Sequence, residues 1–238
     1  MSTTGAEFPA DAVSYHASLA DGWERRCQKR SFRMRQAVLL KCLEGRDLAG
    51  KVWLDAGCGA GTLARWLAAR GCSVLGVDAA SEMVAAAHRA AKAQDCSDRL
   101  SFVRIGTIAR LALDDNLLDG VLCSSVLEYV PDPNACLREF ARVLKPGGLL
   151  LVSIPNRNSV VRRMQSACHQ LGGLFGQQWA RFMDHSHHQY SRCEFERLLT
   201  RAGFLGEKLV PFGGPLPHLA RRSRHWAPLM MFVAQKST

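Results

Sequence analysis

The sequence predicts an α/β fold, a doubly wound and mostly parallel sheet of seven strands, from three observations. Short apolar runs alternate with helical patterns between residues 52 and 154, which is the order of βαβ units. The first run, Val52 to Leu54, is followed by alternating glycines that turn the chain into a helix from Thr62 to Arg70. The second run, Ser73 to Val77, ends at the carboxylate of Asp78. Together these features predict a nucleotide site at the carboxyl edge of the sheet.

The glycine turn supports most of the further predictions. Gly57, Gly59 and Gly61 let a ligand approach the backbone and permit positive φ angles, although such a turn can also be purely structural. The dinucleotide-binding fingerprint has its third glycine three residues after the second, and here Thr62 occupies that position. Asp55 places a carboxylate beside the turn, which suits a cation better than a pyrophosphate. We therefore expect a positively charged ligand.

Asp78 follows Gly59 by 19 residues, the placement of an acidic side chain that holds two ribose hydroxyls. Around these residues the sequence resembles the class I S-adenosylmethionine-dependent methyltransferases, in the glycine motif at 55–61 and in two later segments, 123–133 and 144–151. The resemblance implies a Rossmann-like methyltransferase fold. It also implies S-adenosyl-L-methionine as the cofactor, which leaves as S-adenosyl-L-homocysteine.

The length of 238 residues and the hydrophobic content of 47% suit one well-buried domain over residues 1–238. We expect an N-terminal helical cap, a cofactor-binding core, an acceptor-site lid inserted after the fifth strand, and a C-terminal helix with antiparallel strands. The regions are 1–50, 51–155, 156–190 and 191–238. The family pattern implies that the seventh strand, Trp226 to Ala234, lies antiparallel at the sheet edge.

Localisation is predicted from what the sequence lacks. Residues 1–22 contain no apolar run suited to a signal peptide, and no stretch approaches the roughly 18 apolar residues of a membrane span. The nine cysteines include no Cys-x-x-Cys pair, so we interpret them as small buried hydrophobic residues rather than disulfides or zinc ligands. We expect a soluble, cytoplasmic protein.

The N-terminal region has helical patterns at Asp11 to Ala20 and around Trp23 to Cys42, which are expected to cap the site. Four apolar or aromatic side chains are candidates to close over the ligand: Tyr15, Trp23, Phe32 and Leu39. In related methyltransferases an arginine from such a helix binds the cofactor carboxylate. The resemblance assigns this role to Arg35, with Arg33 second, and the alternative is that both are ordinary exposed helix residues.

Further cofactor contacts are implied by position within the family motifs. Met83 stands where an apolar residue packs against adenine, although an ordinary helix contact is nearly as good an interpretation. Many relatives have an aspartate after the third strand, and Thr107 takes its place here, so adenine recognition is expected from the Thr107 hydroxyl and the Ile108 backbone. Three residues at the carboxyl end of the fourth strand, Gly120 to Ser124, and just beyond it are expected to line the cofactor: Ser124, Ser125 and Leu127.

The insertion after the fifth strand is expected to form the acceptor pocket. Residues 154–158 and 130–133 resemble the ubiquinone-pathway O-methyltransferases, in which the corresponding insertion meets lipid. Basic and apolar side chains occur together along it: Arg162, Arg163, Met164, Leu171, Leu174 and Phe175. We favour a lid helix, and the alternative is peripheral contact with an anionic membrane surface.

The segment from Asp184 to Ser191 holds three histidines, and we expect no metal site there, because their spacing does not bring all three to one ion. A general base is the better interpretation, since imidazole titrates near neutral pH. His188 matches a loop histidine common in relatives, and His185 is the second candidate. The alternative is that they are surface residues. Tyr129 replaces the histidine of a Glu-His pair and stays protonated at neutral pH.

The formal charge is +10, and residues 156–238 carry +8 of it, partly in the basic loop Arg221, Arg222 and Arg224.

The predicted function is S-adenosylmethionine-dependent methylation of a small-molecule acceptor by in-line displacement, with O-methylation favoured over N-methylation. The alternatives are an NAD-dependent oxidoreductase, disfavoured by Thr62, and a non-catalytic nucleotide- or nucleic-acid-binding protein. Methylation of RNA is disfavoured because the Asn-Pro-Pro-Tyr type of motif used on extruded bases is absent after the fourth strand, where Ser124-Ser125-Val126-Leu127 stands instead. The sequence carries no indication of oligomeric state.

Overall fold

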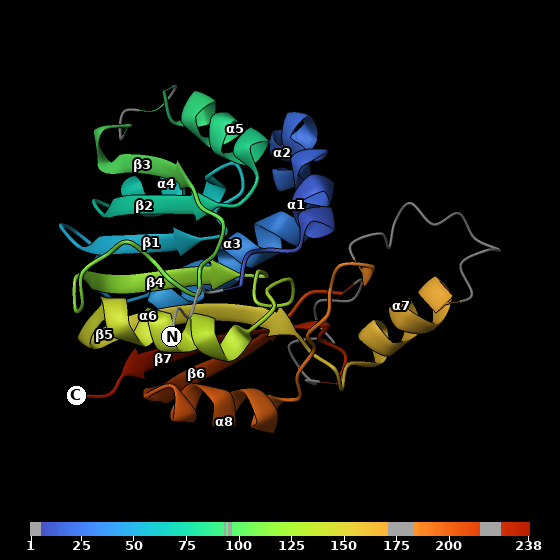
Figure 1. The fold of residues 1–238 in the computed structure, drawn as a ribbon. Helices are drawn as coiled ribbons and strands as arrows, with labels where there is room; N and C mark the ends of the chain where they lie inside the picture. The colour runs from blue at the N-terminus through green and yellow to red at the C-terminus, as the bar shows by residue number, and fades with distance from the viewer. Residues whose placement is uncertain (1–5, 93, 95–96, 171–182, 215–224) are drawn as a thin grey trace.

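The structure, a computed structural model, describes residues 6–92, 94, 97–170, 183–214 and 225–238. These residues form a seven-stranded sheet in the order β3-β2-β1-β4-β5-β7-β6, with helices on both faces (Figure 1). The predicted α/β class with a doubly wound, mostly parallel sheet is confirmed.

The strands are β1 (Val52–Ala56), β2 (Ser73–Asp78), β3 (Leu100–Arg104), β4 (Leu118–Ser124), β5 (Leu144–Pro155), β6 (Phe204–Phe212) and β7 (Leu229–Lys236). The helices are α1 (Ala10–Ala17), α2 (Trp23–Cys27), α3 (Arg30–Leu43), α4 (Thr62–Ala68), α5 (Ser81–Lys92), α6 (Pro133–Val143), α7 (Val160–Gln170) and α8 (Arg192–Arg201), with short 3-10 turns η1 (Ala20–Gly22) and η2 (Ser97–Arg99).

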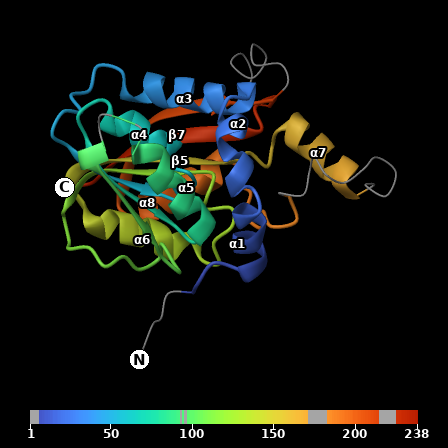
Figure 2. The same ribbon diagram turned by 90° about the horizontal axis from the view of Figure 1, so that it is seen from above.

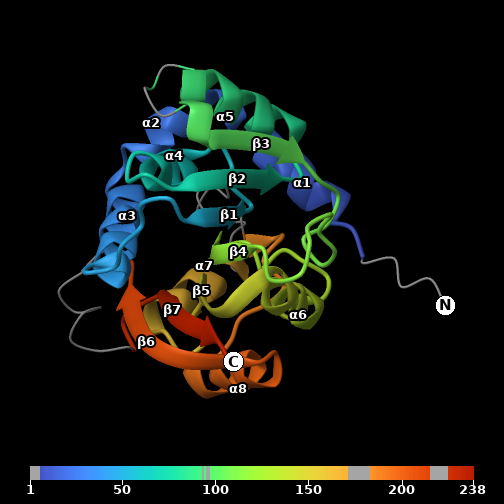
Figure 3. The same ribbon diagram turned by 90° about the vertical axis from the view of Figure 1, so that its left-hand side faces the viewer.

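The sheet separates two hydrophobic cores, because side chains of a strand alternate between its faces. On β4, Val121 and Cys123 face the core under α6 and α8, whereas Leu122 faces the core under α3, α4 and α5. Figure 2 shows α3 and α4 on one side of the sheet and α6 on the other, and Figure 3 shows α3 and α6 flanking it. Burial on both faces explains why the central strands are continuous apolar runs.

The position of the seventh strand was predicted wrongly. β7 pairs antiparallel with both β5 and β6, so it lies inside the sheet, and β6 forms the edge. The physical reason is burial: Met230 and Phe232 fill one core while Met231 and Val233 fill the other. β6 is largely exposed along its length, as suits an edge strand.

Two helices begin at N-terminal capping residues that can be recognised in the sequence. Asp132 accepts hydrogen bonds from the backbone N–H groups of Asn134 and Ala135 at the start of α6. Ser191 and Glu194 form a reciprocal capping box at the start of α8. Each such cap contributes about 1 kcal/mol to stability. These caps fix where the chain leaves the carboxyl edge of the sheet and where it returns to it.

The N-terminal cap, with α1 and α2, lies beyond the carboxyl ends of the parallel strands, at the same end of the sheet as α7 (Figure 1). The second helical pattern, predicted as one stretch, is split into α2 and α3 because Lys29 adopts an extended conformation before α3. Ala20 and Leu19 pack with Met83 and Ala80, which attaches the cap to the start of α5. Within the described residues, no helix is long and apolar enough to cross a membrane.

Candidate active site

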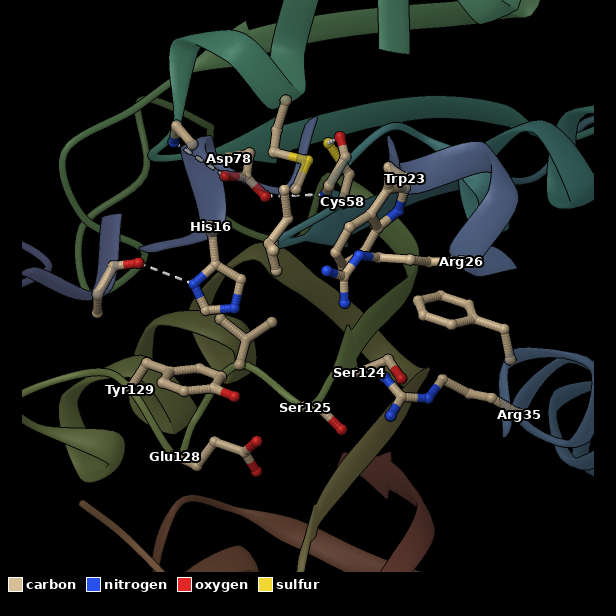
Figure 4. A pocket seen from close by; sticks show the side chains of 18 of the residues that line it. His16, Trp23, Arg26, Arg35, Cys58, Asp78, Ser124, Ser125, Glu128 and Tyr129 are labelled. Carbon is tan, nitrogen blue, oxygen red and sulfur yellow. Dashed lines mark hydrogen bonds between the residues drawn. The ribbon is translucent and has the colours of Figure 1, made fainter. Parts of the chain in front are cut away.

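A cavity of about 460 Å³ opens at the carboxyl ends of β1, β2 and β4, beneath the cap helices. Its volume falls in the usual range for small-molecule sites, about 300–1,000 Å³. The lining side chains come from the strand ends, from α1, α2 and α3, and from α7, so segments far apart in the sequence meet here (Figure 4). A cavity therefore lies at the carboxyl edge of the sheet, where the nucleotide site was predicted.

The glycine loop forms the floor of the cavity. Gly57 has φ 74°, and a Cβ atom there would stand 2.2 Å from Cγ2 of Val126. Gly59 has φ 53°, and its Cβ would lie 3.3 Å from the indole ring of Trp23. Gly61 does not line the cavity with the other two; it caps α4 and its α-carbon faces Phe102. Gly61 was predicted to let the ligand approach the backbone, but here it allows α4 to pack closely on the sheet.

Asp78 connects the glycine loop to the end of β2. Its Oδ2 accepts a hydrogen bond of 2.8 Å from the N–H of Gly59, and its Oδ1 accepts one of 2.9 Å from the N–H of Ala80. Burial raises the pKa of Asp78, and these backbone donors oppose that effect. Each oxygen retains a second lone pair, so the carboxylate can accept hydroxyl hydrogen bonds from the cavity while it holds the loop.

Asp55 is a buried carboxylate with an unsatisfied oxygen. The residue is 2% exposed, and among the described residues no donor reaches its Oδ2. Burial, and next the negative charge of Asp78, raise the pKa of Asp55 to about 7. A cation bound in the cavity would lower that pKa and stabilise the ionised form. The site is thus built for a positively charged group that the protein itself does not supply.

The cap contributes aromatic side chains and a guanidinium. Trp23 and Phe32 line the cavity and contact each other edge to face, with ring centroids 5.3 Å apart. Arg35 lines it too, and within the described part of the chain its Nε has no hydrogen-bond partner. Burial lowers the pKa of Arg35, although the charge of Glu128 opposes this. Arg35 is therefore placed to take an anionic group of a ligand.

Two candidates from the cap are not at the cavity. Leu39 is fully buried in the core between α3 and the sheet. Arg33, the second candidate for the cofactor carboxylate, is exposed and does not line the cavity. Because successive helix residues differ by about 100° in direction, Arg33 and Arg35 point to different sides of α3. Tyr15, by contrast, lines the cavity as expected.

The opposite end of the cavity holds a buried ionic cluster. The carboxylate of Glu128 is 5% exposed and interacts with the guanidinium groups of Arg35 and Arg162. The hydroxyl of Tyr129 hydrogen-bonds to Glu128, and burial followed by the Glu128 charge raises the pKa of this tyrosine. Gln165 also lines the cavity, and its side-chain oxygen finds no partner among the described residues. These groups form a polar end suited to orienting an acceptor.

Ser124 and Ser125 line the cavity between its two ends. Their hydroxyls lie 3.2 Å and 3.3 Å from the hydroxyl of Ser153, which is fully buried on β5. Ser125 has φ 57°, a left-handed conformation that turns the chain abruptly after β4. Leu127, expected beside them, is instead fully buried in the core, and Val126 lines the cavity.

The predicted adenine contacts are only partly assembled. Met83 is 1% exposed and lines the cavity. Thr107 and Ile108 do not line it among the described residues. The hydroxyl of Thr107 accepts a hydrogen bond from the N–H of Ala109, and Ile108 is packed in the core. Neither residue of this segment therefore lies on the cavity wall where adenine recognition was expected.

Both candidate basic histidines lie outside the cavity in the described structure. The Nε2 of His188 donates to the carbonyl of Val130 at 2.9 Å, and the ring stacks on Tyr190. The Nδ1 of His185 pairs with Asp11 at 2.9 Å. The N–H groups of residues 187 and 188 are bonded to the carbonyl of Glu128, which turns the His188 side chain away from the cavity. Neither ring therefore lies on the wall of the cavity in which an acceptor would bind.

Several predictions fall outside the described residues. The distal part of the lid, including Leu171, Leu174 and Phe175, lies in 171–182. The basic loop with Arg221, Arg222 and Arg224 lies in 215–224.

Two functional candidates were missed at the level of sequence, His16 on α1 and Gln165 on α7, and both line the cavity. Arg162, named only as part of the lid, lines the cavity beside Gln165. The signal available in the sequence was the helical spacing of Arg162 and Gln165, which places them on one face. His16 gave no comparable signal, because no motif surrounds it and its position depends on how the cap packs on the sheet.

A family model described as a methyltransferase domain matches residues 54–152, which include the glycine loop and the carboxyl end of β2. Magnesium protoporphyrin IX methyltransferase from Synechocystis, solved with bound S-adenosylhomocysteine, has a TM-score of 0.68 at 20% identity, covering 94% of this chain and 97% of that one. The methyltransferase in a Haloferax volcanii complex with the Trm112 methyltransferase activator has a TM-score of 0.70 at 22% identity, covering 94% and 98%. At these identities the two structures show the fold.

Domain and fold agree, and the chain belongs to the class I S-adenosylmethionine-dependent methyltransferases, whose cofactor is S-adenosyl-L-methionine. Among curated relatives, the ubiquinone biosynthesis O-methyltransferase of Psychrobacter arcticus is 32% identical over 168 residues, or 68% of this chain. The aligned part spans 62% of that relative's own length.

The cavity fits this cofactor on its own chemistry. A sulfonium and an ammonium are cations, which match the unsatisfied carboxylate oxygen of Asp55. A carboxylate matches the unpartnered Nε of Arg35, and ribose hydroxyls match Asp78. The NAD-dependent alternative lacks such a match, because a pyrophosphate beside Asp55 would add negative charge next to a buried carboxylate.

Proposed function

We propose that the protein transfers a methyl group from S-adenosyl-L-methionine to an oxygen atom of a small-molecule acceptor. The observation that carries the proposal is the buried, unsatisfied carboxylate of Asp55 in the same cavity as the Glu128 and Tyr129 cluster. One end of the cavity offers negative charge to a cationic donor. The other end offers hydrogen-bonding groups to an acceptor.

The chain's own residues have distinct roles in this proposal. Asp55 stabilises the cationic end of the donor, Arg35 holds its carboxylate, and Asp78 accepts hydrogen bonds from its ribose. Met83 packs against the adenine. The bound donor supplies an activated methyl group, so the protein's main contribution is to align the acceptor and exclude water.

O-methylation is favoured over N-methylation because the Psychrobacter arcticus relative is named an O-methyltransferase. The acceptor is small because the donor already takes much of a cavity of about 460 Å³.

Helix α7 acts as a lid: Arg162 and Gln165 face the cavity, whereas Met164 is 60% exposed. Membrane contact through that exposed face is the secondary proposal, tested by sedimentation with anionic phosphatidylglycerol vesicles and the Met164→Glu variant.

We also infer that the protein acts in the cytoplasm. The cysteines in the described residues are free thiols, as suits a reducing compartment.

Two measurements test the function. Calorimetry should show S-adenosylhomocysteine binding and no NAD binding. Transfer of a labelled methyl group is then screened over catechols, simple phenols and matched anilines. Methylation of phenols supports the proposal, while methylation of the anilines alone would replace it by N-methylation. Failure to bind S-adenosylhomocysteine would contradict it altogether.

A further inference from the structure

Methyl transfer to a hydroxyl group releases a proton. The carbon–sulfur bond breaks with its electron pair on sulfur, a carbon–oxygen bond forms, and the acceptor's O–H proton must go to a base. His185 and His188 do not line the cavity, as described above. Among the described lining residues, the one imidazole is that of His16, on α1.

The hydrogen bonding of His16 fixes which ring nitrogen is basic. Its Nδ1 lies 2.8 Å from the carbonyl oxygen of Ala12, one helical turn earlier. A carbonyl oxygen only accepts, so Nδ1 carries the hydrogen, and in the neutral ring the lone pair is on Nε2. Figure 4 shows Nε2 on the side of the ring away from Ala12, toward the interior of the cavity.

The surroundings of His16 hold the ring in one orientation. Tyr129 packs edge to face at 4.8 Å between ring centroids, and Tyr15 does so at 5.2 Å. Two further titratable groups act on it, Asp78 from the end of β2 and His185 from the segment before α8. Burial is the largest influence and lowers the pKa of His16, so the ring is neutral and basic at neutral pH.

The other lining groups are poorer proton acceptors. Burial raises the pKa of Glu128, but the guanidinium charges of Arg162 and Arg35 oppose that rise, and the phenol of Tyr129 already hydrogen-bonds to this carboxylate. Asp55 and Asp78 lie at the donor end of the cavity, where their negative charge serves the cation and the ribose.

We propose that Nε2 of His16 is the general base that accepts the acceptor's hydroxyl proton during methyl transfer. This inference rests on the proposed O-methylation. Tyr129, through its ring contact, positions the imidazole. The protonated ring is then stabilised by the nearby carboxylate of Asp78.

The test compares His16→Gln with a matched histidine variant, His188→Gln. With a simple phenol, whose pKa is about 10, kcat of His16→Gln should fall by about 10²–10⁴-fold. With a nitro-substituted phenol that is ionised at the assay pH, kcat should change by less than about threefold, because no proton remains to be removed. The His188→Gln control should retain kcat with both phenols.

The pH profile and the cofactor affinity exclude a merely structural role. Wild-type kcat with the simple phenol should rise with pH through an apparent pKa below 6.5, and this rise should be lost in His16→Gln. The dissociation constant of S-adenosylhomocysteine should stay within about twofold. Equal loss of kcat with both phenols, or a loss confined to cofactor affinity, would overturn the proposal.

An acceptor-free measurement keeps the inference separate from the proposed function. In ¹⁵N-histidine-labelled protein with bound S-adenosylhomocysteine, His16 should be the neutral Nδ1–H tautomer at pH 7.5. A doubly protonated ring at that pH would overturn the assignment, even if phenols are methylated. Conversely, binding of S-adenosylhomocysteine without methylation of any phenol would contradict O-methylation, and with it the role of His16 as base.

Discussion

Replacing Asp55 by asparagine tests the electrostatics of the donor end. The pKa of this carboxyl group is raised from 3.8 to about 7 by burial and the charge of Asp78. Between these values the native state keeps a proton that the unfolded chain has released, so stability falls as pH rises from about 4 to about 7. At about 1.4 kcal/mol per pH unit, the ionised side chain costs the ligand-free protein up to about 4 kcal/mol above pH 7.

Asp55→Asn removes this cost and retains a nearly identical shape. The new amide has an N–H₂ group without a partner, at a cost of about 1–3 kcal/mol. The ligand-free variant should therefore be more stable than the wild type by about 1–3 kcal/mol at pH 8, and should lose that advantage at pH 5. Urea unfolding at both pH values measures this, with Asp114→Asn, at an exposed loop position, as the matched control.

Cofactor binding should respond in the opposite direction. Asp55→Asn should weaken S-adenosylmethionine binding by about 10–100-fold at pH 8, because a buried charge-assisted contact is worth about 1.5–3 kcal/mol. Wild-type affinity should increase with pH through about 7 as Asp55 ionises. If the variant is no more stable at pH 8 and binds the cofactor normally, Asp55 is not the uncompensated carboxylate inferred here.

Three further changes probe the remaining parts of the site. Asp78→Ala should weaken S-adenosylhomocysteine binding by about 1.5–3 kcal/mol in calorimetry, since it removes a charged acceptor of hydroxyl hydrogen bonds; unchanged affinity in a folded variant would refute the ribose assignment. Arg35→Ala should weaken binding about 10–100-fold while Arg33→Ala leaves it unchanged, and equal effects would indicate a general charge effect. Gly57→Ala should lower the free energy of unfolding in urea by about 2–4 kcal/mol, because the new Cβ meets Val126. Gly147 has a similar φ but open space around it, so Gly147→Ala should cost only about 1 kcal/mol. Similar losses of stability in the two variants would mean that backbone strain alone matters.

The donor end was predictable because its information is local. Asp55, Gly57 and Gly59 stand within five residues of each other, and Asp78 ends the next strand of a parallel sheet. Parallel strands bring their carboxyl ends to one edge, so strand order alone places these residues together. The seventh strand was misplaced because its neighbours depend on burial on both faces, which a single apolar run does not reveal.

The acceptor end was less predictable because it is assembled by packing between distant segments. His188 matched a family pattern, but the carbonyls of Glu128 and Val130 bind its backbone and ring and direct it away from the cavity. His16 reaches the cavity because α1 packs against α5 through a small apolar cluster. Neither interaction is encoded by spacing within one segment.

The indole of Trp23 has a consequence for how the cofactor enters. Because a Cβ on Gly59 would lie only 3.3 Å from that ring, the ring covers the backbone surface that the glycine leaves open. A ligand that contacts Gly59 directly therefore shares this surface with the indole, and we expect binding to change the orientation or packing of that ring. If the ring must move, affinity is reduced by the fraction of molecules in which it covers the loop. A change in intrinsic tryptophan fluorescence on cofactor binding would report that movement.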